Sequence, residues 1–318
     1  MVPILLQYQV PEELHELRLD KVLAQLCPDY SRETLKSWIC EGLVQVDGLV
    51  INLPKHKVLM HQLLSVEPVL QTKLTSVPEK IPLNVLFEDD TVLVINKPVG
   101  LVVHPGAGNP QGTLMNALLA HHPDSQYLPR AGIIHRLDKD TSGILIIAKT
   151  LSAHHYFVDQ LQQRLIKREY EAFVYGHMIA GATINQPIDR HPRVRTKMAI
   201  VASGKPAVSH VRVHKRYKHH TWVRVQLETG RTHQIRVHLQ HHGYPLIGDP
   251  TYGGRLRFPK KASESLRECL QGFQRQALHA RQITFVHPVT KETLTFEAPL
   301  PDDLQQLQLC LVANDACT

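Results

Sequence analysis

The sequence predicts an α+β fold, and three observations lead to that prediction. Several segments alternate apolar and polar residues, as half-buried antiparallel strands do: 210–216, 221–230 and 282–289. Helical patterns are fewer and fall in three stretches: 113–121, 151–166 and 232–242. Strands and helices do not follow one another in the regular βαβ order that a parallel sheet requires, so we expect an α+β architecture and not an α/β one.

The first elements form a compact module between about residues 14 and 68. Apolar residues recur near helical spacing in its first helix: Leu17, Val22, Leu23 and Leu26. A second helix follows Ser31, an expected N-cap, and Gly42 is placed to end it. Asp47 and Gly48 then predict a tight turn between two short strands. We therefore expect two short helices followed by a small hairpin.

A polar stretch over residues 71–82 contains two prolines and no periodicity, which indicates a linker. We place a first domain at 15–70 and a second domain at 83–305, on either side of this linker. The second domain opens with candidate strands at 92–98 and 143–150. Both are apolar runs, so we expect these two strands to be buried.

The balance of charge concerns the partners of the chain more than its fold. The 318 residues include 36 Lys and Arg against 29 Asp and Glu, which gives a formal charge of +7 and an isoelectric point of about 9.1. Nucleic acid and anionic membrane surfaces are the usual partners of such a chain. The sequence has no basic amphipathic helix with an aromatic face and no apolar run near ~18 residues, so we expect nucleic acid and no membrane.

The cysteines indicate the compartment in which the chain works: Cys27, Cys40, Cys269, Cys310 and Cys317. Their number is odd, their spacing is wide and no CxxC pair occurs, which is typical of reduced thiols. The N-terminal residues lack a basic region and a small-residue cleavage site, so we expect no signal peptide and a cytoplasmic protein.

The stretch HRLDKDTSG, residues 135–143, holds the acid Asp138 between the bases Arg136 and Lys139. An apolar strand follows it, so we expect Asp138 on a loop that enters a strand of a rigid sheet. One interpretation is a charged turn with local ion pairs. The other is a carboxylate that neighbouring cations keep ionised, so that it can act as a nucleophile or a base.

Residues 229–254 bring cationic side chains to the start of a helix: Arg231, His233, Arg236 and His238. We expect Thr232 to cap this helix and Gly230 to allow a tight approach, which together favour an anion site. A metal site is the alternative for the histidines. However, only His238 and His242 have i, i+4 spacing, and no Glu lies between them, so we expect no metal ligands here.

The stretch KREYEAFVYG, residues 167–176, predicts a strand that opens with Lys167, Arg168 and Tyr170. A strand tyrosine usually belongs to a core, although it is also a good platform for stacking an unpaired base. Residues 104–113 contain three glycines and two prolines, which predicts an irregular loop over a groove. That loop matches neither glycine-rich phosphate-binding pattern, so we expect no nucleotide cofactor.

Three of these stretches, in their order along the chain, resemble the RluA family of pseudouridine synthases: HRLDKDTSG, KREYEAFVYG and GRTHQIRVH. In detail VVHPGAGNPQGTLMNAL, LETGRTHQIRVH and GDPTYGG resemble its RluD branch, enzymes of the ribosomal large subunit. RLDKVL and SRETLKSWICEGLVQVDG resemble an S4 RNA-binding domain. The resemblance covers about residues 15–300. It implies a bent, mostly antiparallel mixed sheet crossed by the active cleft, with a small S4-like domain before it.

The resemblance also implies that the chain isomerises uridine to pseudouridine in RNA, without a cofactor or a metal. The family's essential aspartate falls on Asp138, its base-contacting tyrosine on Tyr170, and the basic partner of the aspartate on Arg236. Arg136 falls on the arginine associated with the stack that the flipped base vacates. Further RNA contacts are expected at His135, Thr141, Arg231 and His233, and in the S4-like domain at Arg18, Arg32 and Lys36.

The order of the chemical steps stays open at this point. As a carboxylate, Asp138 can attack C1′, attack C6, or remove the 2′ proton to give a glycal. The RluD-like details favour the helix 69 loop of 23S ribosomal RNA as the substrate, either free or in a large-subunit precursor. The alternatives are another uridine in ribosomal or transfer RNA and, from a different class, a non-catalytic RNA-binding assembly factor. We expect a monomer.

Overall fold

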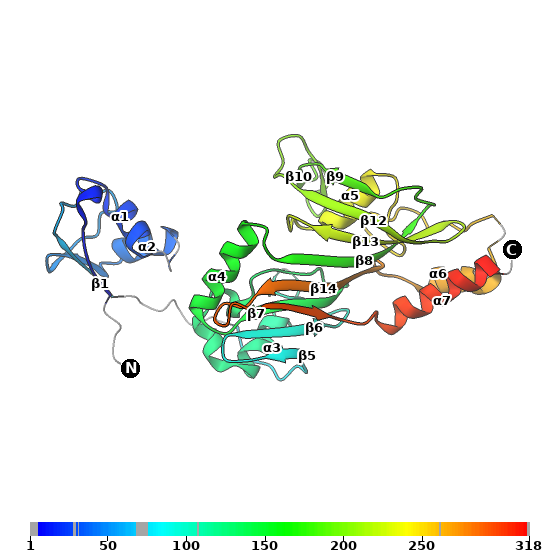
Figure 1. The fold of residues 1–318 in the computed structure, drawn as a ribbon, viewed down its shortest axis with the longest axis horizontal. Helices are drawn as coiled ribbons and strands as arrows, with labels where there is room; N and C mark the ends of the chain where they lie inside the picture. The colour runs from blue at the N-terminus through cyan, green and yellow to red at the C-terminus, as the bar shows by residue number, and fades with distance from the viewer. Residues whose placement is uncertain are drawn as a thin grey trace. The chain divides into compact units, whose positions relative to one another are not determined.

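The chain divides into two compact units, Met1–Thr75 and Ser76–Thr318 (Figure 1). The structure is a computed structural model, and it describes residues 6–27, 30, 32–67, 76–106, 108–260 and 262–316. The predicted N-cap Ser31, residues 71–75 of the predicted linker, and Cys317 lie outside the described residues. Within the described ranges, no helix is long and apolar enough to cross a membrane.

The first unit combines a four-stranded antiparallel sheet with two helices. Its strands pair in the order β1-β4-β2-β3, with the bounds β1 Leu6–Gln9, β2 Val44–Val46, β3 Leu49–Val50 and β4 Leu63–Val66. A 3₁₀ turn at Glu12–Leu14 precedes helices α1 Leu19–Leu26 and α2 Arg32–Cys40. The two helices and the β2–β3 hairpin, with Asp47 and Gly48 at its turn, confirm the prediction for this module. Strands β1 and β4 were not predicted.

The core of the first unit comes from one face of each helix. Leu19, Val22 and Leu23 of α1 are fully buried, as are Leu35 and Ile39 of α2. A spacing of three and four residues puts such side chains on one face of a helix. Each helix therefore buries one apolar stripe.

The second unit is built on a nine-stranded mixed sheet with the order β5-β6-β7-β14-β8-β13-β12-β9, and β15 pairs with β14. The strand bounds are β5 Val85–Glu88, β6 Val92–Lys97, β7 Ser142–Ala148, β8 Lys167–Tyr175, β9 Ala182–Asn185, β12 Val208–Arg216, β13 His220–Leu227, β14 Leu278–Val286 and β15 Thr293–Glu297. A separate pair joins β10 Ile188–Arg190 to β11 Met198–Ile200. Strand β7 runs parallel to β14, and the other strand neighbours of this sheet are antiparallel. The predicted α+β fold with a mostly antiparallel mixed sheet is thus confirmed.

The parallel pairing of β7 with β14 is short and tight. Ser142 pairs with His279, and Gly143 pairs with Ala280. Gly143 has a φ of 115°, and a Cβ atom there would lie 2.2 Å from the carbonyl oxygen of Ala280, so only glycine fits at this position. This junction fixes the start of β7 near the middle of the sheet. It also fixes the end of the loop that precedes β7.

Five helices pack around this sheet: α3 Leu114–His121, α4 Leu151–Gln162, α5 Gln234–His241, α6 Glu264–Gly272 and α7 Asp302–Ala316. Short 3₁₀ turns at Pro123–Tyr127 and Pro129–Gly132 follow α3. The first three helices confirm the predicted helical stretches. Helix α4 ends before residue 166, where the prediction ended it, because Arg164 adopts a left-handed conformation with φ 62°. Phe157 of α4 packs with Ile146 and Phe285 in the core.

Helices α6 and α7 pack on the sheet close to one another (Figure 1). Leu270 of α6 and Leu307 of α7 are buried in one cluster with Phe173 of β8 and Trp222 of β13. The rings of Phe173 and Trp222 stack with their centroids 5.1 Å apart. Phe173 alternates along β8 with the residues that point to the other face of the sheet, so β8 supplies side chains to both faces.

Candidate active site

A cleft of about 780 Å³ lies in the second unit, which is within the usual size range of ligand sites. Its lining includes three segments that are distant in sequence: the loop before β7, strand β8, and the loop from β13 into α5. Asp138 lies on the first of these, a loop that enters a strand as predicted. His104 and Pro105, from the predicted irregular loop, also line the cleft.

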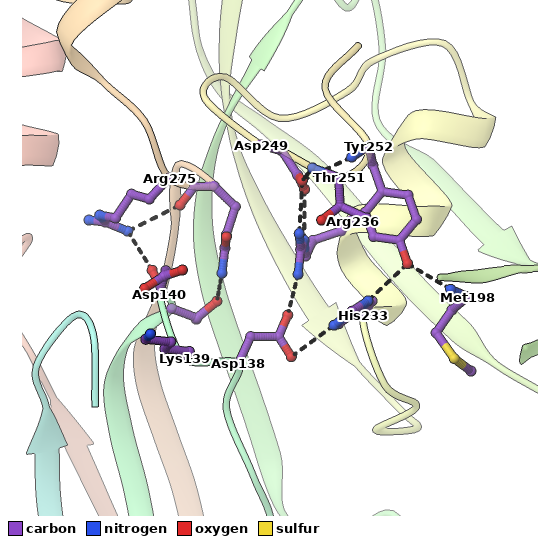
Figure 2. A network of polar contacts seen from close by, with 12 residues as sticks. Asp138, Lys139, Asp140, Met198, His233, Arg236, Asp249, Thr251, Tyr252 and Arg275 are labelled. Carbon is purple, nitrogen blue, oxygen red and sulfur yellow. Dashed lines mark hydrogen bonds and ion pairs between the residues drawn. The ribbon is translucent and has the colours of Figure 1, made fainter. Parts of the chain in front are cut away.

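Arg236 connects two carboxylates in this site (Figure 2). Its Nη1 donates a hydrogen bond to Oδ2 of Asp138 at 3.0 Å, so the pairing that the resemblance implied is present. Its Nε and Nη2 donate to Oδ2 and Oδ1 of Asp249 at 2.7 and 2.8 Å. The arginine that orients Asp138 is therefore itself held by a second carboxylate.

Asp249 has a fully buried side chain and is oriented by its own turn. Its Oδ1 also accepts hydrogen bonds from the backbone N–H groups of Thr251 and Tyr252, at 2.8 and 3.0 Å. Burial alone would raise the pKa of Asp249, but its hydrogen bonds from Arg236 and from these N–H groups hold that pKa below its ordinary value. Burial also opposes the charge on Arg236, yet its bonds to the two carboxylates raise the pKa of Arg236 above its ordinary value. The buried pair is thus stable in its ionised form.

His233 is the second neighbour of Asp138, with Nε2 3.8 Å from Oδ1 of the carboxylate (Figure 2). Its Nδ1 lies 2.8 Å from the hydroxyl of Tyr252, and that hydroxyl accepts the backbone N–H of Met198 at 2.8 Å. Because Nε2 of His233 faces the carboxylate of Asp138, we assign the hydrogen of the neutral ring to Nε2, so that Nδ1 accepts the hydrogen of the Tyr252 hydroxyl. Burial, assisted by Arg236 and opposed by Asp138, lowers the pKa of His233. The neutral ring then carries its hydrogen on Nε2, which faces Asp138.

The start of α5 differs from the prediction, because His233 and not Thr232 occupies the N-cap position. His233 has a φ of 56°, in the left-handed region, and makes no side-chain capping bond. Thr232 is exposed, so the prediction that it caps the helix is wrong. The side-chain oxygen of Gln234 stabilises this turn by accepting the backbone N–H of Arg231 at 3.0 Å. As a result the cleft receives His233 from the turn and Arg236 from the first turn of the helix.

A buried lysine holds the loop that carries Asp138. Lys97 ends β6 and is fully buried, and its Nζ donates to the carbonyl oxygens of Pro98, Leu101 and Lys139 at 2.7, 3.0 and 2.9 Å. Three acceptors match the three hydrogens of a protonated amine. Burial lowers the pKa of Lys97 to about 7, although nearby carboxylates oppose this shift. Lys97 thus ties the segment after β6 to the backbone next to Asp138.

Tyr170 and Arg136 both line the same cleft as Asp138. Tyr170 lies on β8 and is only 6% exposed. Burial raises the pKa of Tyr170, an effect that Arg168 opposes and Asp138 strengthens, so the phenol is neutral. Arg136 is exposed and extends the lining towards solvent. Their roles towards a flipped base stay predictions.

The other predicted contacts of this unit also line the cleft and have partners within the protein. Nε2 of His135 accepts a backbone N–H of β7 at 3.1 Å, and burial lowers the pKa of His135 to about 3. Thr141 accepts a hydrogen bond from the side chain of Gln276 at 3.0 Å, and Nε of Arg231 donates to a backbone carbonyl at 3.1 Å. Their contacts with RNA stay predictions. His238 is fully buried and is not part of the lining.

Arg18, Arg32 and Lys36 belong to the first unit. Arg18 pairs with Asp20 at 2.6 Å, and Arg32 and Lys36 are exposed one turn apart on α2. Cations exposed at such positions suit the phosphate groups of a nucleic-acid backbone. Their contacts with RNA stay predictions as well.

Three residues that support the site were not predicted individually: Asp249, Tyr252 and Lys97. Their contacts join residues that are distant in sequence, since Asp249 lies 13 residues from Arg236 and Lys97 lies 42 residues from Lys139. The motif GDPTYGG was one available signal, because an Asp before a Pro in a turn commonly bonds its own backbone. That rule predicts the bonds of Asp249 to Thr251 and Tyr252, but it does not predict the bond to Arg236.

The arrangement around Asp138 is suited to acid–base or nucleophilic chemistry. Oδ2 is bonded to Arg236, whereas Oδ1 is 3.8 Å from His233, which is longer than a hydrogen bond. The side chain of Asp138 is 17% exposed and lines the cleft, so a substrate there can reach this side chain. Within the residues that the structure describes, no group of three or more His, Cys, Asp or Glu side chains could hold a metal ion.

Two family models match the chain. The model described as RNA pseudouridylate synthase matches residues 91–241, a range that contains Asp138, Tyr170 and Arg236. The model described as S4 domain matches residues 17–63, within the first unit. Each of the two units therefore contains one match.

Full-length relatives and a solved structure agree with these matches. The ribosomal large subunit pseudouridine synthase D of Pasteurella multocida (strain Pm70) is 52% identical over 297 residues, which is 93% of this chain and 92% of that protein. The protein of the same name from Haemophilus influenzae is 50% identical over 314 residues, which is 99% of this chain and 97% of that protein. The structure of human RNA Pseudouridylate Synthase Domain Containing 4 is 26% identical, with a TM-score of 0.57 over 72% of this chain and 93% of that chain.

Proposed function

The chain belongs to the RNA pseudouridylate synthase family, in the branch of the ribosomal large subunit pseudouridine synthases. We propose that it isomerises uridine to pseudouridine in 23S ribosomal RNA, with Asp138 as the reactive group. The observation that carries the proposal is the ion pair of Asp138 with Arg236 in the lining of a cleft of about 780 Å³. A carboxylate that is fixed in position and still reachable from the cleft is what a reaction at the ribose or the base requires.

The reaction exchanges one bond for another within a single nucleotide. The bond between C1′ and N1 of uridine breaks, the uracil rotates, and C5 bonds to C1′. The hydrogen on C5 leaves to solvent and N1 takes up a proton, so the product is an isomer of the substrate. A base that is stacked in a helix cannot rotate in this way, and the uridine must therefore be flipped out into the cleft.

Asp138 acts as the carboxylate of the first step, by attack on C1′, by attack on C6, or by removal of the 2′ proton. The resemblance favours the last of these, the glycal route. Oδ1 takes the 2′ proton as the C1′–N1 bond breaks, which leaves a C1′–C2′ double bond and a uracil anion. The carboxyl group then returns the proton to C2′ while C5 bonds to C1′. Arg236 orients the carboxylate and favours the ionised form from which the reaction starts and to which it returns.

The remaining site residues position the nucleotide. Tyr170 stacks on the uracil and assists the removal of the proton from C5. Arg136 fills the stack that the flipped base vacates. Further contacts with the RNA come from His135, Thr141, Arg231 and His233.

The proposed target is the helix 69 loop of 23S ribosomal RNA, free or within a large-subunit precursor, and the enzyme acts as a monomer in the cytoplasm. The names of the relatives and the RluD-like motifs support a large-subunit target. The S4 unit adds a second, tethered contact, which raises the effective concentration of the RNA at the cleft. Arg18, Arg32 and Lys36 supply cations for its phosphates, so we expect the affinity to fall as salt concentration rises.

Tritium release from ribosomal RNA that carries [5-³H]uridine tests the reaction, because the C5 hydrogen leaves in every route. Wild type should release tritium, and Asp138→Asn should release none while it still binds the RNA within about tenfold, or roughly 1.4 kcal/mol. A variant that still makes pseudouridine would reject Asp138 as the reactive group. Pseudouridine mapping in a strain that lacks the gene tests the target, and unchanged modification of the helix 69 loop would reject it.

A non-catalytic RNA-binding assembly factor is the second candidate, since the S4 unit and the cationic lining of the cleft would serve it equally well. The same assay separates the two functions. Tight RNA binding by the wild type without tritium release, from either ribosomal or transfer RNA, would favour the assembly factor.

A further inference from the structure

Arg168 is a buried cation without a partner in the part of the chain that the structure describes. Three arginines there are less than a tenth exposed: Arg168, Arg236 and Arg275. Arg236 binds two carboxylates, and Arg275 binds the carboxylate of Asp303. The side chain of Arg168 makes no ion pair or hydrogen bond with a described residue, and its buried Nε has no acceptor. Burial of an unpaired charge is strongly unfavourable, so a contribution to stability does not explain why an arginine stands at position 168.

The fold directs Arg168 into the cleft. Arg168 and Tyr170 are two residues apart on β8, so their side chains share one face of the sheet, and both line the cleft. Its strand neighbours are the apolar residues Leu227 of β13 and Ile283 of β14. A Cβ atom on Gly230 would lie 2.7 Å from Nη1 of Arg168, so the guanidinium lies directly against the backbone of the loop that leads into α5. The site is therefore built from both the sheet and this loop.

The charges around the cleft favour an anionic ligand for Arg168. Among the described residues, six arginines line the cleft but only two carboxylates do, Asp138 and Glu228, and each of these already pairs with another arginine. Two titratable neighbours of Arg168 are uncharged, because burial lowers the pKa of His135 to about 3 and raises the pKa of Tyr170. No described group in the cleft is thus left to neutralise Arg168.

We propose that Arg168 binds an anionic oxygen of the uridine nucleotide held at Asp138. This inference rests on the proposed function of the cleft. The oxygen is a phosphate oxygen of the flipped nucleotide or a carbonyl oxygen of the departing uracil. When the C1′–N1 bond breaks, its electron pair passes to N1 and is shared with O2 and O4, which makes those oxygens strong acceptors. A guanidinium donates well to either kind of oxygen.

The two sources of the oxygen differ in the step that they affect. A phosphate carries its charge throughout the reaction, so loss of Arg168 would weaken RNA binding and leave the chemical step unchanged. A carbonyl oxygen gains its charge only as the uracil leaves, so loss of Arg168 would slow the chemical step and leave binding unchanged.

Arg168→Met tests the proposal, because methionine keeps an unbranched apolar stem and removes the charge. Its dissociation constant and its single-turnover rate of tritium release are measured with a [5-³H]uridine-labelled transcript of the large-subunit stem-loop. We expect one of the two to change by about tenfold or more, as for the loss of a charge-assisted hydrogen bond. We also expect its free energy of unfolding to stay the same or to rise, because an unpaired buried charge is removed.

Two further variants control this result. Arg281 lies on β14 and pairs with Glu169 and Glu297 at 3.0 Å, so Arg281→Met should lower the stability and leave the rate and the affinity unchanged. Gly230→Ala leaves the charge of Arg168 in place but displaces its guanidinium. If Arg168→Met changes the dissociation constant, Gly230→Ala should change it to a smaller degree. If Arg168→Met changes the single-turnover rate, Gly230→Ala should change that rate to a smaller degree.

The proposal is overturned if Arg168→Met stays within about twofold of wild type in both rate and affinity. It is also overturned if the variant is markedly less stable or does not fold, because Arg168 would then have a structural role. If the wild type releases no tritium, the proposed function fails. The dissociation constants still test Arg168 in that case, since binding of the transcript does not require isomerisation, and an unchanged affinity would overturn its role as an anion site.

Discussion

The carboxylate of Asp249 binds two nitrogens of Arg236, Nε at 2.7 Å and Nη2 at 2.8 Å, and leaves Nη1 to reach Asp138. A pair with two parallel hydrogen bonds fixes the plane of the guanidinium as well as its position. The backbone N–H groups of Thr251 and Tyr252 fix Asp249 in turn. The orientation of the Asp138 carboxylate therefore depends on a turn that lies far from it in the sequence.

Asp249→Asn should weaken both the fold and the reaction. The change keeps the shape of the side chain but leaves Arg236, which is 5% exposed, with a single carboxylate. We expect the free energy of unfolding to fall by about 3 kcal/mol, at the lower end for a broken buried pair because Asp138 remains. We expect the single-turnover rate to fall by about tenfold or more, since a misplaced carboxylate reacts poorly. Urea unfolding and tritium release measure the two effects.

Glu297→Gln is the control for Asp249→Asn. Glu297 pairs with Arg281 at 3.0 Å but is 53% exposed, so its loss should change stability by less than about 1 kcal/mol and leave the rate unchanged. A normal rate in Asp249→Asn, measured where the variant is folded, would show that Asp249 supports the fold and does not orient Asp138.

The hydrogen-bond chain from Met198 through Tyr252 to His233 predicts which nitrogen of His233 carries the hydrogen. Because Nε2 faces the carboxylate of Asp138 and the Tyr252 hydroxyl can donate to Nδ1, the neutral ring should carry its hydrogen on Nε2. Nitrogen NMR of histidine-labelled protein distinguishes the two tautomers. In Tyr252→Phe the donor to Nδ1 is absent, so both tautomers should be present. The rate of isomerisation should then fall by about fivefold, the equivalent of roughly one hydrogen bond.

Two NMR results would contradict this assignment. One is a wild-type ring with its hydrogen on Nδ1, which would mean that Tyr252 accepts from His233. The other is a doubly protonated ring at neutral pH, since burial lowers the pKa of His233 below its ordinary value of 6.5. His241→Gln, on an exposed position at the end of α5, serves to assign the spectrum without a change near Asp138.

The elements that could be predicted from the sequence are those that depend on neighbouring residues. The apolar spacing of α1 and the Asp47-Gly48 turn are local, and both were predicted correctly. The parallel pairing of β7 with β14 was not predicted, because it joins Ser142 to His279, 137 residues further on. Local periodicity carries no information about such a pairing. Strand β1, with four residues, was too short to give a pattern.

The site shows the same division between local and distant contacts. The residues alone left Asp138 as either a turn residue or a reactive carboxylate, and the family resemblance selected Arg236 as its partner. Asp249 was missed because its contact with Arg236 depends on how a turn folds back onto α5. The cap at Thr232 was predicted wrongly because the rule assumes an extended N-cap residue, whereas His233 takes that position with a positive φ.

Four histidines should make the fold sensitive to mild acid. Burial lowers the pKa of His104, His154 and His220 to about 4, and that of His135 to about 3, from an ordinary value of 6.5. Because each folded-state pKa lies below the unfolded one, the unfolded chain binds more protons between these values. The stability that neutral rings provide is complete above pH 6.5 and is lost as the pH falls towards about 4.

His220→Phe tests this pH dependence outside the cleft. His220 is 2% exposed at the start of β13, and its ring lies 5.5 Å from that of Tyr175, so phenylalanine should fit with little change. Urea unfolding at several pH values between about 7.5 and 4.5 compares the two proteins. Below pH 6.5 the wild-type free energy of unfolding should fall more steeply than that of the variant, by up to about 1.4 kcal/mol per pH unit, the effect of one proton. Above that pH the difference between them should stay constant. Equal slopes throughout would mean that the folded protein accepts a proton on His220 as readily as the unfolded chain does.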